Sequence, residues 1–199
     1  IRRWLRVLKS VDRLKRNRCM RNWGSAAWYL AQQTDGGIRD MVQEGKIRIR
    51  RANIYDWDEA MALAWRTFLR FEANDYGQEG IDNFRDFLTD ALLHRMFLKG
   101  DYPVFIALDG EKQAGMISLR NKRHISLLFV EEGHHHQGIG RRLIQSMEQY
   151  IQTEYQERKI TVNAAPYAVG FYRQVGFEDV APQLSKDGII YTPMEKKLL

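Results

Sequence analysis

The chain has a single cysteine, Cys19, and no apolar run long enough to cross a membrane. One cysteine excludes an internal disulfide and fits a reducing, cytoplasmic environment. A spanning helix needs about 18 consecutive apolar residues, so we expect no membrane span. The basic N-terminus has no apolar segment after it, which argues against a secretory signal. Internal repeats and low-complexity tracts are also missing, and the 199 residues suffice for one domain with an appendage.

The positive charge of the chain is concentrated in its first forty residues. These hold ten Lys and Arg against three Asp and Glu, a net charge of +7, out of totals of 31 and 25. The remaining 21 basic and 22 acidic residues nearly cancel, so nucleic-acid binding is not expected of residues 41–199. Trp4, Leu8 and Val11 recur at helical spacing, which is compatible with a basic amphipathic helix or with a loosely ordered extension over residues 1–40. We place the start of the folded domain at Met41.

After Met41 the hydrophobic periodicity predicts alternating groups of strands and helices. Period-two alternation and apolar runs indicate strands over residues 46–52, 104–108, 114–119, 125–130, 160–163, 177–180 and 189–194. Helical periodicity covers residues 57–71, 79–97, 138–155 and 166–176. Asp56 is expected to cap the first helix, and Asp109-Gly110-Glu111-Lys112 to form a hairpin turn. This order predicts one α/β or α+β domain with a mixed sheet.

The stretch after the strand over 125–130 carries the strongest functional signal. It reads Glu131-Glu132-Gly133-His134-His135-His136-Gln137-Gly138-Ile139-Gly140-Arg141-Arg142. Backbone N–H groups at a helix start, together with the helix dipole, form a site for an anion. Gly138 and Gly140 allow close approach of a phosphate, because neither carries a Cβ atom. The third glycine of the dinucleotide fingerprint and the Gly-Lys-Ser/Thr of a P-loop are missing, which argues against those nucleotide sites.

Two motifs resemble those of one enzyme family. Residues 135–140 resemble the Gln/Arg-x-x-Gly-x-Gly/Ala motif of the GCN5-related N-acetyltransferase (GNAT) superfamily. About thirty residues later, the segment 163–177 resembles the family's Ala-x-x-Phe/Leu-Tyr-x-x-x-Gly-Phe signature. The resemblance implies a mixed, mostly antiparallel sheet with flanking helices and a splayed strand pair. It also implies transfer of an acetyl group from acetyl-CoA to a primary amine, by direct attack in a ternary complex.

The resemblance also implies roles for individual residues. The pyrophosphate of CoA would bind the backbone at His135, His136, Gln137, Gly138, Ile139 and Gly140, beside Arg141. The pantetheine arm would pair like an added strand with Leu128, Phe129 and Val130, with Asn163 as a polar contact. The Leu128 amide would stabilise the oxyanion, and Tyr172 would protonate the departing thiolate. His135 departs from the usual Gln or Arg, and Ala165 stands where many members carry Asn.

The general base is left open by the sequence. Strand alternation puts His124, Ser126, Leu128 and Val130 on one face of the sheet. His124 takes the position of a glutamate in histone-type members, four residues before the oxyanion amide, but a solvated strand-end histidine is the alternative.

An acidic cluster is a second source of a base. Glu72, Asp75 and Glu79, with Tyr76 between them, fall where the family's acceptor cleft lies. They would attract a cationic amine, or Glu72 would itself be the base; the alternative is a solvated helix end.

Other functions are weighed against this one. The run His134-His135-His136 invites a metal site, but successive side chains point different ways and no Cys or acid joins them at ligand spacing. No metal is therefore expected. A non-catalytic module of the same fold, which binds acyl-CoA as a sensor or acts through partners, is the alternative function. The acceptor and the oligomeric state stay open, although dimers are common in families of this shape.

Overall fold

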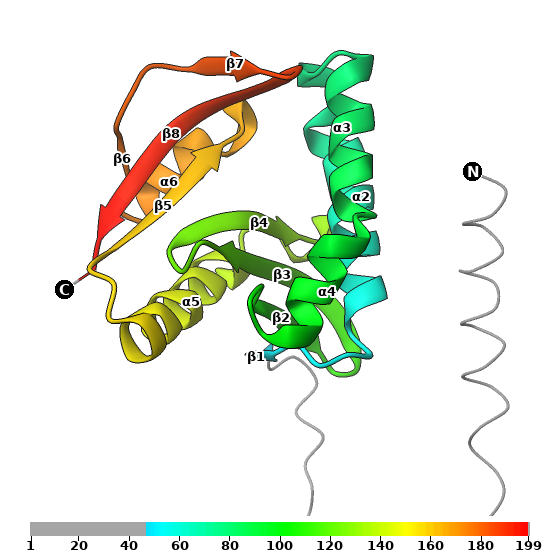
Figure 1. The fold of residues 1–199 in the computed structure, drawn as a ribbon, viewed down its shortest axis with the longest axis vertical. Coiled ribbons are helices and arrows are strands. Elements are labelled where there is room, and N and C mark those ends of the chain that lie inside the picture. Colours follow the sequence, from blue (N-terminus) through cyan, green and yellow to red (C-terminus); the bar gives the residue numbers. More distant parts are fainter. Residues whose placement is uncertain (1–46, 199) are drawn as a thin grey trace, which may run out of the picture. The chain divides into compact units, whose positions relative to one another are not determined.

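The computed structural model describes residues 47–198, which form one sheet with helices packed against it (Figure 1). The strands are β1 (Arg48–Arg51), β2 (Val104–Asp109), β3 (Lys112–Arg120), β4 (His124–Val130), β5 (Lys159–Ala164), β6 (Glu178–Asp179), β7 (Leu184–Lys186) and β8 (Ile189–Lys197). The α-helices are α2 (Trp57–Phe71), α3 (Gln78–Leu88), α4 (Ala91–Lys99), α5 (Ile139–Tyr155) and α6 (Val169–Gln174). The expected extension over residues 1–40 and the domain start at Met41 lie outside the described residues.

The sheet is mixed and mostly antiparallel, which confirms the predicted fold class. Its strand order is β1-β2-β3-β4-β5-β8-β6, and β7 pairs with β8. Only β4 and β5 run parallel, and they pair at just two positions, His124 with Thr161 and Ile125 with Val162. Beyond Ile125 the two strands separate, which is the predicted splayed pair. The gap divides the sheet into a β1–β4 half and a β5–β8 half (Figure 1).

Two segments differ from the predicted elements. The helix expected over 79–97 is divided into α3 and α4, because the Asp90 carboxylate accepts the Leu92 N–H (2.7 Å) and starts a new helix. The strand β7 was not expected, and it forms a hairpin with β8 around Asp187 and Gly188. Among residues 47–198, no helix is both long and apolar enough to span a membrane.

An extra residue in β4 reverses the faces of that strand. The β3–β4 register shifts between Ser118 and Leu119, opposite Ser126. Ile125 therefore packs into the core against α5, whereas Leu127 and Phe129 pack into the core against α2. The prediction that His124 and Leu128 share one face is wrong, because a bulge shifts the alternation by one residue. His124 lies opposite Arg120, on the α2 side of the sheet.

Two hydrophobic cores hold the helices on the sheet. One lies between the sheet and α5, and the other between the sheet and α2, α3 and α4. Ala60, Leu63 and Ala64 of α2 are fully buried at helical spacing. Ion pairs of Arg66 with Glu131 and of Arg70 with Glu132 tie the second half of α2 to the segment after β4. This packing fixes the C-terminal end of α2 over the gap in the sheet.

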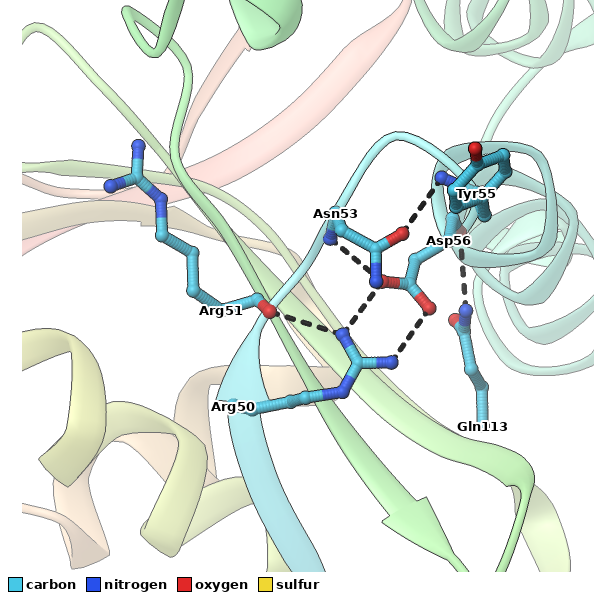
Figure 2. A network of polar contacts seen from close by, with 6 residues as sticks. All are labelled: Arg50, Arg51, Asn53, Tyr55, Asp56 and Gln113. Carbon is cyan, nitrogen blue, oxygen red and sulfur yellow. Dashed lines mark hydrogen bonds and ion pairs between the residues drawn. The ribbon is translucent and has the colours of Figure 1, made fainter. Parts of the chain in front are cut away.

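The start of α2 is fixed by a polar network around Asp56 (Figure 2). The helix begins at Trp57 as predicted, but the Asp56 carboxylate makes no cap bond to it. It accepts instead from the Arg50 guanidinium (2.7 and 3.0 Å) and from the backbone N–H of Asn53 (2.7 Å). Gln113 donates to the Asp56 carbonyl (3.1 Å). The network joins the edge strand β1 to the start of α2.

Replacement of Asp56 by alanine should lower the free energy of unfolding by about 2 kcal/mol at pH 7. Burial alone would raise the pKa of Asp56, but the hydrogen bonds from Arg50 and Asn53 outweigh it and lower that pKa. The stabilisation is therefore present above the carboxylate's unfolded pKa and is lost as the pH falls through its folded value. Urea denaturation between pH 2 and pH 7 measures both effects. Asp58→Ala, at an exposed position in the same helical turn, is the matched control, and equal losses in the two variants would contradict the network's role.

Candidate active site

A cleft of about 770 Å³ lies where β4 and β5 separate. Its walls come from β4, β5, α2, α3, α6 and the β7–β8 hairpin. Most of the residues predicted for catalysis or acceptor binding line it: Glu72, Tyr76, His124, Leu128 and Tyr172. Asn163, predicted as a contact of the cofactor arm, lines it as well. Asp75 is exposed and is not among the lining residues. The structure thus brings together side chains that lie a hundred residues apart in the sequence.

The backbone of β4 presents free polar groups to this gap. The Glu131 N–H donates to the Ala114 carbonyl (2.9 Å), so Ala114 and Glu131 form a hydrogen-bonded pair. Such pairs alternate along an antiparallel ladder, which makes Ile117 and Leu128 a non-hydrogen-bonded pair. The N–H of Leu128 is therefore directed away from β3, toward the gap beside β5. An extended arm in the gap would meet this N–H as a strand partner would.

The turn into α5 is the segment predicted to bind an anion. Gly138 caps this 17-residue helix with φ of +76°, a left-handed conformation that favours glycine, and no atom lies near the position of a Cβ there. The first N–H groups of a helix have no partner within it, so they face outward from this turn. Gly140 has a different reason to be glycine, because a Cβ there would lie 3.0 Å from the Phe171 ring. That contact packs α5 against α6 and links the two motifs.

The side chains of this turn fix its shape. His135 Nε2 donates to the Val130 carbonyl (2.8 Å), and its ring lies 4.8 Å from the ring of Phe71. Phe71 in turn stacks on Tyr167 (5.5 Å), so three rings join α2 to both motif segments. Gln137 donates to the Gly133 carbonyl (3.0 Å). The backbone N–H of His135 donates to the Glu132 carbonyl (3.2 Å), so the prediction that this N–H binds the anion is wrong. The backbone that remains for an anion begins at His136.

Tyr172 reaches the cleft from α6 and is 5% exposed. Its ring lies edge-on to Phe171 and Phe177, which hold it in place. Burial raises the pKa of Tyr172, and the negative charge of Glu72 raises it further. The hydroxyl is therefore protonated at physiological pH and is able to donate a proton.

Glu72 has the electrostatics of a general base. It follows the last residue of α2, is half-buried, and its carboxylate makes no hydrogen bond or ion pair within residues 47–198. Burial raises the pKa of Glu72 to about 7, with a further contribution from the charge of Asp75. Such a carboxylate takes up and releases a proton near neutral pH. Its charge acts on Tyr172, so an acid and a base face the same cleft.

The other predicted residues have different properties. Burial and the nearby Arg120 lower the pKa of His124 to about 4, so its ring is neutral and weakly basic at pH 7. Its Nδ1 forms a hydrogen bond with the Thr161 hydroxyl (2.9 Å). Tyr76 donates its hydroxyl proton to the Ile190 carbonyl (3.3 Å). Burial and then the charges of Glu72 and Asp75 raise the pKa of Tyr76, so it stays protonated.

Sequence reasoning missed the part of the cleft formed by α3 and the β7–β8 hairpin. This part includes Asn83, Phe84, Phe87, Lys186, Asp187 and Tyr191. A signal was present, because Asp187-Gly188 is a typical hairpin turn. Within residues 47–198, no three His, Cys, Asp or Glu side chains gather as a metal ion would require.

Comparison with known proteins adds family evidence to this geometry. The model of the acetyltransferase (GNAT) domain family matches residues 72–198, a range that includes both motifs and most residues that line the cleft. No protein with curated annotation matches the chain.

Several solved structures share the fold. A GCN5-related N-acetyltransferase from Rhodopseudomonas palustris is similar, with a TM-score of 0.67 and 22% identity over 78% of this chain and 98% of that one. The PaiA N-acetyltransferase from Thermoplasma acidophilum, in complex with coenzyme A, has a TM-score of 0.63 and 21% sequence identity. The match covers 76% of this chain and 99% of that one. An aminoglycoside 6′-N-acetyltransferase complexed with coenzyme A has a TM-score of 0.53 and 14% sequence identity. The match covers 76% of this chain and 97% of that one. At these identities the likeness is one of fold.

Proposed function

Because this chain belongs to the GNAT acetyltransferase family, we propose that it transfers the acetyl group of acetyl-CoA to a primary amine. One observation supports this proposal above the others. The gap beside β4 opens into a cleft that holds a carboxylate with a pKa of about 7, Glu72, and a buried protonated phenol, Tyr172. A base and an acid beside a free backbone amide are the groups that acyl transfer from a thioester requires.

Acetyl-CoA would lie with its diphosphate on the backbone from His136 to Gly140, near the exposed Arg141. Its arm would run along the unpaired edge of β4 at Leu128, Phe129 and Val130. Val130, opposite Gly115, is also in a non-hydrogen-bonded pair, so its N–H faces the gap as well. Its carbonyl already accepts from His135, so we assign the Val130 N–H to the arm and keep the Leu128 N–H for the thioester carbonyl. Two of the similar structures are complexes with coenzyme A, which supports CoA as a ligand of this chain.

The amine would attack the thioester carbon directly, and each proton has an acceptor or donor on this chain. Glu72 would take the proton from the ammonium or from the tetrahedral intermediate, because its pKa of about 7 suits this step. The Leu128 N–H would stabilise the oxyanion. Tyr172 would protonate the thiolate as the C–S bond breaks. His124 is the weaker candidate for the base, since its pKa of about 4 leaves little affinity for a proton.

A thiol-release assay with acetyl-CoA and a panel of amines tests this function. We expect release of free thiol only when an amine is present, and binding of CoA by calorimetry in its absence. CoA binding without transfer to any amine would instead support a non-catalytic acyl-CoA-binding module. Failure to bind any CoA species would contradict both functions.

A further inference from the structure

The β7–β8 hairpin rests directly on α3 (Figure 1). A Cβ on Gly80 of α3 would lie 2.4 Å from the Gly188 carbonyl oxygen, and a Cβ on Gly188 would lie 2.8 Å from the Gly80 nitrogen. Real Cβ atoms do not approach so closely, so both positions require glycine. Asn83 donates to the Asp187 carbonyl (2.9 Å), which adds a hydrogen bond beside the glycine contact.

This contact bridges the two halves of the splayed sheet. The hairpin extends from β8, which belongs to the β5 half, whereas Phe84 of α3 packs against Phe129 of β4 (ring centroids 5.9 Å apart). Residues of both the hairpin and α3 line the cleft. The backbone contact between α3 and the hairpin therefore spans the side of the cleft where we place the acceptor. Because backbone atoms make this contact, rotation of a side chain cannot open it. The volume of about 770 Å³ falls in the range of small-molecule sites.

The walls of the spanned region combine aromatic rings with carboxylates. Phe84, Phe87, Phe129 and Tyr191 supply rings. Three carboxylates, those of Glu72, Glu79 and Asp187, line the cleft with two cations, Arg120 and Lys186. Glu72 is half-buried, and the other four residues are exposed. Rings favour a flat apolar body, and carboxylates favour an ammonium group attached to it. A polycation would place several ammonium groups against these rings, with too few carboxylates to pair with them.

We propose that the acceptor is a small arylalkylamine, and that the hairpin over residues 184–190 excludes protein lysines from the cleft. The proposal rests on the acetyl transfer proposed above. The amino group lies at Glu72 and the aromatic ring among the side chains of α3 and the hairpin. Because main chain lies on this side of the cleft where Gly80 meets Gly188, we expect it to clash with the main chain of a folded protein that offers a lysine.

The test uses the full chain and three acceptors: 2-phenylethylamine, spermidine and a lysine-containing peptide. In the unsubstituted protein, kcat/KM for 2-phenylethylamine should exceed that for spermidine by about tenfold or more, and that for the peptide by about 100-fold. Gly80→Ala places a methyl group against the hairpin carbonyl and displaces the hairpin. We expect it to lower kcat/KM for 2-phenylethylamine by about tenfold and to raise that for the peptide.

One further variant serves as a control, and a second tests the hydrogen bond beside the glycine contact. Gly77→Ala, three residues before Gly80, adds a methyl group where no atom lies within 4 Å, and it should behave like the unsubstituted protein. Asn83→Ala removes the hydrogen bond to Asp187 and should shift selectivity in the direction of Gly80→Ala, but less. CoA affinity and the thermal midpoint, measured for every variant, show whether each is folded.

The outcomes separate this proposal from the function on which it rests. Equal use of the peptide or of spermidine by the unsubstituted protein would overturn the acceptor class while leaving acetyl transfer intact. A folded Gly80→Ala variant with unchanged selectivity would overturn the role of the hairpin. Absence of transfer to every amine, with CoA bound, would overturn the proposed function and this proposal together.

Discussion

Replacement of Glu72 by glutamine should lower kcat/KM for acetyl transfer by about 100-fold or more. Glutamine keeps the size and polarity of the side chain but cannot accept the amine's proton. Glu72 is the half-buried carboxylate of the cleft whose pKa is raised to about 7, so its ionised form should be the active one. Thiol release under kcat/KM conditions, with CoA affinity measured in parallel, separates a catalytic loss from a loss of binding.

The pH profile gives a sharper test of the same assignment. In the unsubstituted protein, kcat/KM should rise as the pH increases through about 7, because Glu72 loses its proton there. Glu72→Gln should remove this acidic limb. Asp75→Asn should keep the limb but move it to lower pH, because the Asp75 charge contributes to the raised pKa of Glu72. A limb near pH 7 that survives in Glu72→Gln would assign the base to another group.

Glu72→Gln should also raise the free energy of unfolding at alkaline pH. The folded-state pKa of Glu72 lies above its ordinary value of 4.5, so the folded protein retains a proton that the unfolded chain releases between about pH 4.5 and 7. Stability therefore falls across that interval and stays lower above it. Glu72→Gln should raise the free energy of unfolding by about 2 to 3 kcal/mol at pH 8 and change it little at pH 4. Urea denaturation at both pH values measures the difference, and equal gains at the two would contradict the raised pKa.

The sequence allowed the fold to be predicted because its hydrophobic signals are local. The helix predicted over 57–71 is observed at those bounds, and each predicted strand after Met41 overlaps an observed one. The division of the second helix was missed, although the Asp90 cap signal lay within the helical pattern. Both α3 and α4 pack on the same core, so the apolar periodicity continues across the break between them. Periodicity alone therefore could not reveal the break.

The candidate site was predictable where it depends on backbone position and less so where it depends on environment. The motifs predicted that Gly138 starts a helix and that Tyr172 lies in a short helix, and both positions are observed. The sheet face predicted for His124 was wrong, because a single bulged residue leaves no clear mark in an alternating sequence. The different basicities of Glu72 and His124 arise from burial by elements far away in the chain. Such desolvation is a property of the assembled cleft.

Replacement of Tyr172 by phenylalanine should lower kcat by about 10- to 1000-fold while CoA affinity is retained. The ring contacts with Phe171 and Phe177 do not need the hydroxyl, so the packing of α6 should survive. The loss should fall on kcat, because the proton reaches the thiolate only as the C–S bond breaks. Steady-state kinetics with saturating amine, together with calorimetry of CoA binding, measure the two quantities.

Tyr102→Phe is the matched control for the loss of a buried tyrosine hydroxyl. Tyr102 is fully buried and bonded to the Ser118 hydroxyl (2.7 Å), and it does not line the cleft. Its substitution should cost about 1 kcal/mol of stability and leave kcat unchanged. The contrast distinguishes proton donation from general packing, because both variants remove one hydroxyl from a buried ring. If Tyr172→Phe keeps full turnover, the thiolate leaves without this acid, and Tyr172 serves only to pack α6 against the sheet.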